Sequence, residues 1–115
     1  MGAVCGFLGV GIGAFGAHGL KNLVPEARLV TFETGVRYQM YHAFALFAAA
    51  WAAQALSEKW AARAALWFVV GVLLFSGSLY ALVLADMPKL GIITPFGGLA
   101  FLAGWACLGF AARAS

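Results

Sequence analysis

Charged residues are scarce in this sequence. Of its 115 residues only 10% are Asp, Glu, Lys or Arg, whereas 64% are hydrophobic and the mean hydropathy is +0.95. Soluble domains carry about 25% charged and roughly 45–50% apolar residues. A water-soluble globule of this length could not bury so much apolar surface. We therefore expect a single domain, residues 1–115, that is integral to a membrane.

The few charges form no basic cluster, and cysteine is equally rare. The net charge of +3 arises from seven Lys and Arg residues spread along the chain. Nucleic-acid binding needs a clustered basic face, so we expect no nucleic-acid partner. Cys5 and Cys107 lie in apolar segments and are too few for a disulfide framework or a zinc site. We expect buried free thiols, and membrane lipid as the surroundings of the chain.

Glycine, by contrast, is abundant at the N-terminus and recurs there at helical spacing. Each interior glycine costs a helix in water about 1 kcal/mol relative to alanine. In a bilayer the backbone must satisfy its own hydrogen bonds, which forces the helix, and a glycine stripe lets another helix approach closely. A glycine-rich nucleotide loop would need a preceding strand and a phosphate-binding lysine, which this segment does not offer. The stripe consists of Gly2, Gly6, Gly9, Gly13 and Gly16.

A cleaved signal peptide is the other alternative for this segment. Such a peptide has basic residues ahead of its apolar stretch and a small-residue cleavage site. The first Lys or Arg here is Lys21, and glycine is poor material for the apolar stretch. We expect a transmembrane helix that is retained.

Four apolar stretches approach the length of about 20 residues that crosses a bilayer. The second starts with an amphipathic lead-in after Pro25, in which apolar residues recur at helical spacing. The sequence therefore predicts an all-α integral membrane protein, with four transmembrane helices in an antiparallel bundle. The helices are expected at about residues 2–20, 25–56, 60–85 and 90–112.

The predicted topology places both termini on one side of the membrane. Four of the seven Lys and Arg residues fall at the pole of the first and third connections, and the rest fall at the opposite pole. The positive-inside rule then weakly favours termini on the outside, and it leaves dual topology open.

A second stripe of small residues lies in the last apolar stretch, with the same spacing of three and four. We expect the two stripes either to pack against each other within the chain or to face a second copy of it. The second stripe consists of Gly97, Ala100, Gly104, Cys107 and Ala111.

Unusual polar residues map to the pole of the first and third connections. Ionisable groups at membrane depth are costly and are candidates for function. Glu33 and Arg37 are four residues apart, the spacing of a helical ion pair at the entry of the second span. His42 is favoured as an interfacial aromatic residue; the alternative is a polar pocket in which it bonds to the first or last helix. The candidate polar site consists of His18, Glu33, Arg37, Gln39, Tyr41, His42, Asp86 and Thr94.

These residues include no recognisable catalytic or metal set. His18 and His42 lack a clear third ligand, so we predict neither a metal nor a cofactor. Ser76 and Ser78 have no histidine near them in the chain, and we expect them to hydrogen-bond to their own or a neighbouring helix. We predict that the protein is not an enzyme.

Four blocks of sequence resemble one family in their order and content. They are GAFGAHGL from Gly13, TFETGVRYQMYHAFAL from Thr31, LLFSGSLY from Leu73 and GIITPFGGLAFLAGW from Gly91. Together they are similar to the YgdD/YwdK-like family of small bacterial membrane proteins, a domain of unknown function with eukaryotic relatives. The resemblance implies a four-helix protein of the bacterial inner membrane, and it brings no activity with it.

Three functions are then open. The first is a small packing or accessory protein that contacts itself or a larger membrane complex, favoured by the two small-residue stripes. The second is a small transporter or channel, including a dual-topology one, which would want a buried charge near the midplane. The third is an enzyme or a lipid-head-group binder, in which Arg37 meets phosphate near His42. We favour the first.

Overall fold

The computed structural model describes residues 2–114, and within them it is helical with no strand, which confirms the all-α prediction. Three short elements accompany the α-helices: two 3₁₀-helices, η1 (Leu20–Asn22) and η3 (Pro88–Ile92), and one π-helix, η2 (Val72–Ser76). The α-helices are α1 (Gly2–His18), α2 (Glu26–Ala55), α3 (Glu58–Gly71), α4 (Gly77–Leu84) and α5 (Thr94–Ala114).

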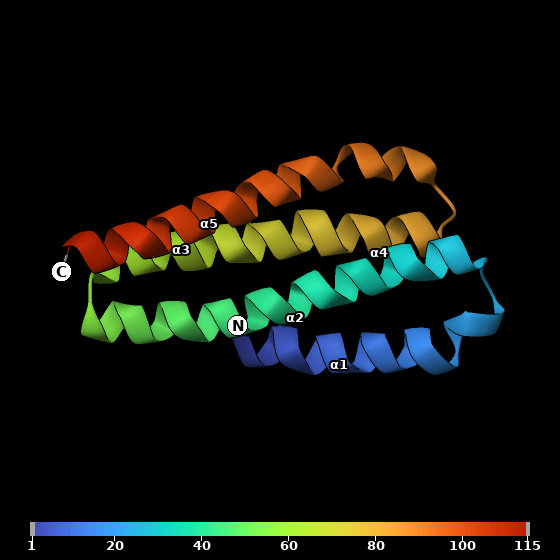
Figure 1. Cartoon of the computed structure of the whole chain (residues 1–115), viewed down its shortest axis with the longest axis horizontal. Helices are drawn as coiled ribbons and strands as arrows, with labels where there is room; N and C mark the ends of the chain where they lie inside the picture. Colours follow the sequence, from blue (N-terminus) through green and yellow to red (C-terminus); the bar gives the residue numbers. More distant parts are fainter. Residues whose placement is uncertain (1, 115) are drawn as a thin grey trace.

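The π-helix η2 joins α3 and α4 into one continuous rod. Gly71 and Gly77, which flank η2, keep helical backbone angles (φ −61°, ψ −43° and φ −60°, ψ −42°). The chain therefore folds into four long rods, with sharp reversals between them (Figure 1).

The four rods form a flattened assembly in which α1 and α5 are the outer helices. α1 packs on α2, α2 packs on the α3–α4 rod, and that rod packs on α5 (Figure 1). The assembly measures 49 × 26 × 15 Å along its principal axes. The predicted contact between the stripes of the first and last helices is therefore wrong, because each stripe meets a different neighbour.

The glycine stripe of α1 faces α2. A methyl group added at Gly16 would lie 2.8 Å from the ring of Phe32, and one added at Gly13 would lie 3.1 Å from a methyl of Val36. Gly9 is buried against Met40 by the same close approach. A side chain at Gly16 would therefore displace the ring of Phe32, and one at Gly9 would displace the flexible end of Met40.

The small residues of α5 face the α3–α4 rod. Gly97 lies against the backbone of Phe75, and a methyl group added at Gly104 would lie 2.5 Å from the ring of Phe68. Cys107 is buried beside Phe68, and Ala111 is completely covered. Both stripes therefore pack mainly within the chain, although a methyl group added at Gly6 would meet nothing within 4 Å.

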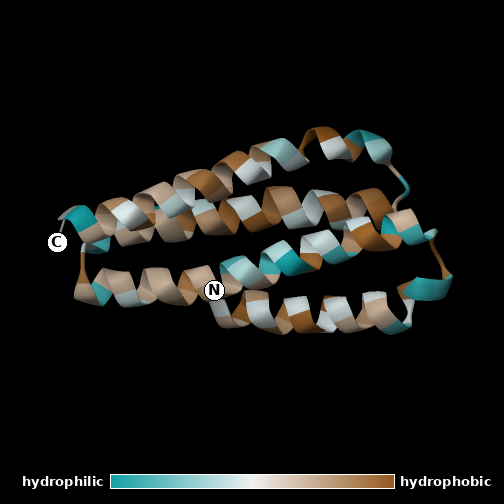
Figure 2. Cartoon of the chain, viewed as in Figure 1, coloured by the Kyte–Doolittle hydropathy of each residue, from teal (hydrophilic) through white to brown (hydrophobic). Residues whose placement is uncertain are grey.

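The outer surface of the rods is apolar between two charged ends. Hydrophobic residues predominate along the middle parts of α1, the α3–α4 rod and α5, whereas the middle of α2 has a hydrophilic stretch (Figure 2). Three stretches of the described chain are long and apolar enough to cross a membrane: Gly2–Asn22, Glu58–Leu84 and Pro88–Arg113. α2 is the longest helix, but polar residues lower its hydropathy.

Candidate functional site

The structure separates the eight predicted polar residues instead of collecting them at one pole. Gln39 and His42 are buried, each 4% exposed, and Thr94 is half-buried. The prediction of one polar pole is therefore wrong, because the buried residues lie near the middle of α2 and face different neighbours. The exposed members are His18, Glu33, Arg37, Tyr41 and Asp86.

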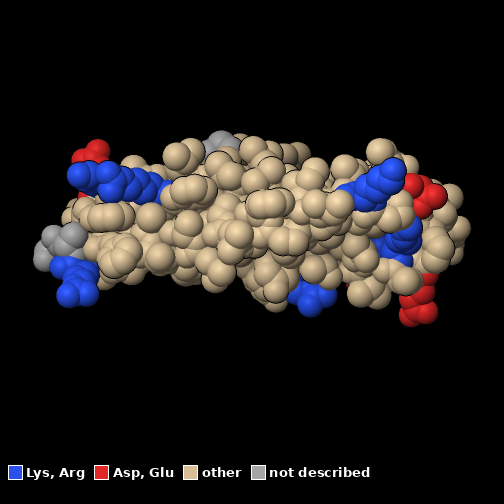
Figure 3. All heavy atoms as spheres, turned by 90° about the horizontal axis from the view of Figure 1, so that it is seen from above, with Lys and Arg blue, Asp and Glu red and all other residues tan. Residues whose placement is uncertain are grey.

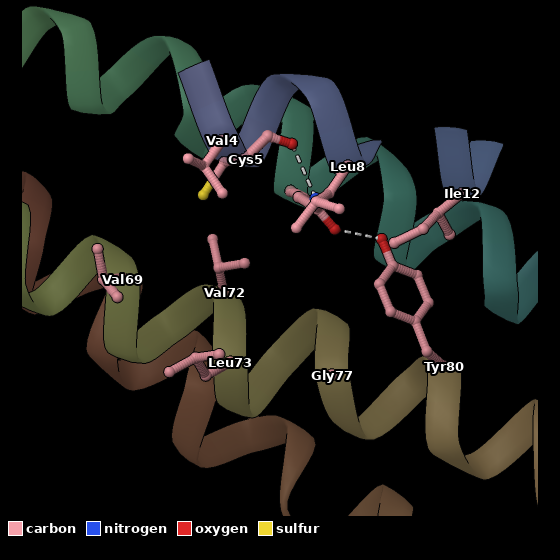
Figure 4. Close-up of a pocket in the computed structure, with 10 residues that line it drawn as sticks. Val4, Cys5, Leu8, Ile12, Val69, Val72, Leu73, Gly77 and Tyr80 are labelled. Atoms are coloured by element: carbon pink, nitrogen blue, oxygen red, sulfur yellow. Dashed lines mark hydrogen bonds between the residues drawn. The ribbon is translucent and has the colours of Figure 1, made fainter. Parts of the chain in front are cut away.

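Gln39 ties three helices together. Its amide nitrogen donates to the carbonyl oxygen of Cys5 in α1 at 2.8 Å, and its amide oxygen accepts from the hydroxyl of Tyr80 in α4 at 2.7 Å (Figure 4). Hydrogen bonds of this kind hold helices together where water is absent. Both the amide nitrogen and the amide oxygen of Gln39 are thus hydrogen-bonded within the protein.

Ser76 and Ser78 hydrogen-bond to neighbouring helices and to their own, which confirms the prediction. Ser76 Oγ donates to the carbonyl oxygen of Gly35 at 2.6 Å. Ser78 Oγ donates to the carbonyl oxygen of Phe75 at 2.9 Å and lies 2.6 Å from the hydroxyl of Thr94. Because a serine hydroxyl has one hydrogen, Thr94 is the donor in that last contact.

The π-helix lies beside these serines. The amide of Gly77 bonds to the carbonyl oxygen of Val72, five residues back, which marks the wider turn. The extra residue turns the following helix, so that Ser76 faces α2 and Ser78 faces α5. No periodicity in the sequence indicated this π-turn, although the Ser-Gly-Ser run was visible.

His42 links α2 to α5 and has no free ring nitrogen. Its Nδ1 lies 2.7 Å from the carbonyl oxygen of Tyr38, and its Nε2 lies 3.2 Å from the indole nitrogen of Trp105. A carbonyl only accepts and an indole only donates, so Nδ1 carries the hydrogen and the ring is neutral. The ring stacks on Phe101 with 3.6 Å between centroids.

The arrangement of His42 restricts its chemistry. A metal ligand or a general base needs a free lone pair on nitrogen, and the only lone pair of this ring accepts from Trp105. The structure therefore has the alternative arrangement, in which His42 bonds to the first or last helix, with α5 as the partner. The ring acts as a polar link between helices.

The ion pair at the pole was missed by sequence reasoning. Arg28 Nη2 lies 3.3 Å from Asp86 Oδ1, and Nη1 donates to the carbonyl oxygen of Leu82. Asp86 adopts φ 52°, a left-handed conformation that Asp tolerates better than most residues. In the sequence, Arg28 and Asp86 both lie close to the first and third connections, which is the one signal that places them near each other.

Glu33 and Arg37 do not form the predicted ion pair. Both side chains are exposed, and the ion pair that the described residues form within 4.0 Å is that of Arg28 with Asp86. The spacing of four residues permits such a pair on a helix, but the charged groups of Glu33 and Arg37 lie more than 4.0 Å apart. They do share one shallow groove of about 330 Å³, in which Gly13, Phe32 and Val36 are the other lining residues.

A second groove, of about 240 Å³, lies between α1 and the α3–α4 rod (Figure 4). Leu8 and Ile12 line one wall, and Val72 and Leu73 line the other. Gln39 contributes to its lining, but its amide is already bonded. The groove is apolar and has no group placed for catalysis among the described residues.

Comparisons with known proteins indicate the same class of molecule. Residues 12–98 match the family described as "Protein of unknown function (DUF423)". The chain is 46% identical over 113 residues to the UPF0382 membrane protein YwdK of Bacillus subtilis, covering 97% of this chain and 92% of that protein. It is 39% identical over 106 residues to the UPF0382 inner membrane protein YgdD of Escherichia coli, with 92% and 81% covered. No solved structure matches the chain.

Proposed function

We propose, from the premise that this chain belongs to the DUF423 family of membrane proteins, that it is a four-span packing or accessory protein and not an enzyme. One observation carries the proposal. Every buried side-chain nitrogen or oxygen among the described residues has a hydrogen-bond partner within the protein. The longest-range of these bonds join different helices, so the polar residues serve assembly.

The same observation argues against catalysis. A general acid or base must be able to exchange a proton with a substrate. The candidate with the most suitable chemistry, His42, has both ring nitrogens engaged. Tyr80 and Gln39 bond to each other.

The position of α2 supports four spans. Its 30 residues make a helix about 45 Å long, more than the roughly 30 Å of the hydrocarbon core. The α1–α2 connection lies at one end of the molecule and the α2–α3 connection at the other (Figure 1). If α1 and α3 cross the membrane, α2 must cross it too. Its polar residues Gln39 and His42 face inward, whereas Glu33 and Arg37 are exposed on its outer face.

The transporter alternative has less support. A carrier of this size wants a charged group buried near the midplane. The buried polar side chains of the described chain are those of Gln39, His42, Ser76 and Ser78, which carry no acid and no permanent cation. Glu33 and Arg37 are exposed on the outer face of α2 and are not buried between the helices.

Native mass spectrometry of the full chain in mild detergent tests the proposal, combined with cross-linking in membranes. We expect an oligomer or a co-purifying membrane protein. A strict monomer that captures no partner would contradict the proposal. Transport of a substrate by the purified chain in vesicles would also contradict it, in favour of the alternative.

A further inference from the structure

Arg37 is an exposed cation close to the middle of the longest helix. It is the twelfth of the 30 residues of α2. The ring of its neighbour Tyr38 lies 4.7 Å from that of Phe75 and 6.3 Å from that of Phe101. Phe75 and Phe101 each lie at the middle of a charge-free stretch, residues 64–85 and 90–112. Arg37 therefore lies near the midplane of the apolar belt.

The charges of the molecule otherwise gather at its two ends. Figure 3 shows Lys and Arg at both ends, with one cation standing apart in the apolar surface between them. A cation in the apolar belt is costly unless it meets an anion. Glu33 is one turn away and exposed, and among residues 2–114 neither side chain has an ion-pair partner.

Glu33 of the same chain is not paired with Arg37 in the structure. An anion from outside the chain has two sources at this depth in a membrane: a lipid head group or another protein chain. Lipid phosphates lie beyond the hydrocarbon, about 15 Å or more from the midplane. Arg37 begins only a few residues from that midplane, and Glu33 beside it would repel an anionic head group. A second copy of this chain, by contrast, brings Glu33 to a similar depth.

The exposed face of α2 suits a two-fold contact. Its apolar members are Val30, Tyr41 and Phe44, which are 54%, 53% and 66% exposed and follow the same helical stripe as the two charges. In a two-fold interface every contact occurs twice. If residue i of one chain contacts residue j of its partner, then residue j of the first chain contacts residue i of the partner. Two opposite charges four residues apart satisfy this rule when the cation of each chain meets the anion of the other chain.

We propose that α2 packs against α2 of a second copy, with Arg37 of each chain paired with Glu33 of the partner subunit. The four-residue rise between them is about 6 Å along the helix, which a long Arg side chain can span. This inference rests on the proposed packing function and names a second copy as the partner.

Two single charge reversals test the interface. Glu33→Arg gives a face with two cations, and Arg37→Glu gives a face with two anions. Each variant alone should self-associate at least tenfold more weakly than the native chain. Mixed with each other, they should form a heterodimer, because each cation then faces an anion. An ion pair within one chain cannot produce this result, since neither variant can form one.

The measurement uses two differently tagged full-length chains co-expressed in membranes. A cysteine introduced by Tyr41→Cys, in a background where Cys5 and Cys107 are replaced by alanine, reports proximity through a thiol cross-linker. Lys89→Glu is the matched control, because it reverses an exposed charge outside the α2 face and should leave association unchanged.

The outcomes separate the interface from the proposed function. If both reversals leave self-association intact, the interface is wrong and the packing function stands. If the native chain is monomeric but captures another protein, the same conclusion holds. If the reversed variants do not accumulate, the neutral variants Glu33→Gln and Arg37→Gln decide: each should weaken association, and an unchanged dimer overturns the interface. Loss of bound phospholipid in Arg37→Gln with an unchanged dimer would assign Arg37 to lipid instead.

Discussion

The inner and outer faces of α2 use their polar residues in opposite ways. On the inner faces, Gln39 and His42 have every strong hydrogen-bonding group occupied by another helix or by their own backbone. On the outer face, Glu33 and Arg37 are exposed and have no ion-pair partner among the described residues. The inner residues hold this chain together, whereas the outer ones are available to something outside it.

Paired substitutions of phenylalanine should give the largest difference between the two faces. Phe32, 1% exposed, packs with Leu20 and Val83, whereas Phe47 on the same helix is 55% exposed and is not part of the proposed α2 interface. Phe32→Ala should lower the free energy of unfolding by about 3 kcal/mol, because it leaves a cavity. Phe47→Ala should change it by less than about 1 kcal/mol. Denaturant titration in detergent micelles measures both, and equal losses would contradict the distinction.

Loss of the Gln39 amide should have the next largest effect. Gln39→Leu removes both interhelical bonds and leaves the Tyr80 hydroxyl without its acceptor. Interhelical hydrogen bonds in membranes are worth about 0.6 kcal/mol on average and up to about 1.7, so we expect a loss of roughly 1–3 kcal/mol. Gln54→Leu, an exposed position on the same helix, is the matched control and should have little effect. The same titration compares the two variants.

The contact between His42 and Trp105 should give a smaller but specific effect. A double-mutant cycle with His42→Phe and Trp105→Phe isolates the hydrogen bond, because phenylalanine retains the aromatic packing. We expect a coupling energy of about 0.6 kcal/mol. Additive losses in the cycle would mean that the two rings contribute only by packing.

The exposed ion pair at the pole should contribute least. Asp86→Asn keeps a residue that tolerates φ 52° and removes the charge facing Arg28. Because Asp86 is 86% exposed, we expect the free energy of unfolding to fall by less than about 0.5 kcal/mol. A loss comparable to that of Gln39→Leu would show that the pole is better shielded than its exposure indicates.

The extent of sequence-based prediction differs between fold and site. The membrane class, the helical fold and the family followed from composition and from blocks such as Thr31 to Leu46, because these depend on local pattern. The neighbours of each small-residue stripe did not follow, since Gly9 and Gly104 match any close helix equally well. The spacing of small residues does not determine which helices pack together, so it could not predict that α1 packs on α2.

The same limit explains the polar residues. Sequence position placed Gln39 and His42 toward one end of the second span, and the candidate site grouped them with Glu33 and Arg37. Whether each of these side chains is buried or exposed depends on which side of α2 meets α1, α4 or α5. A rotation of about 100° per residue separates the faces, so adjacent polar residues can have unrelated surroundings.

By itself, the sequence determined that this chain is an all-helical membrane protein, because scarcity of charge and long apolar runs suffice for that. Its four blocks of characteristic residues identified the DUF423 family. Only the tertiary structure decided that the two small-residue stripes face different helices. It also decided that Gln39 and His42 are buried and hydrogen-bonded to other helices, whereas Glu33 and Arg37 are exposed. These outcomes depend on contacts between segments far apart in the chain, which no local pattern encodes.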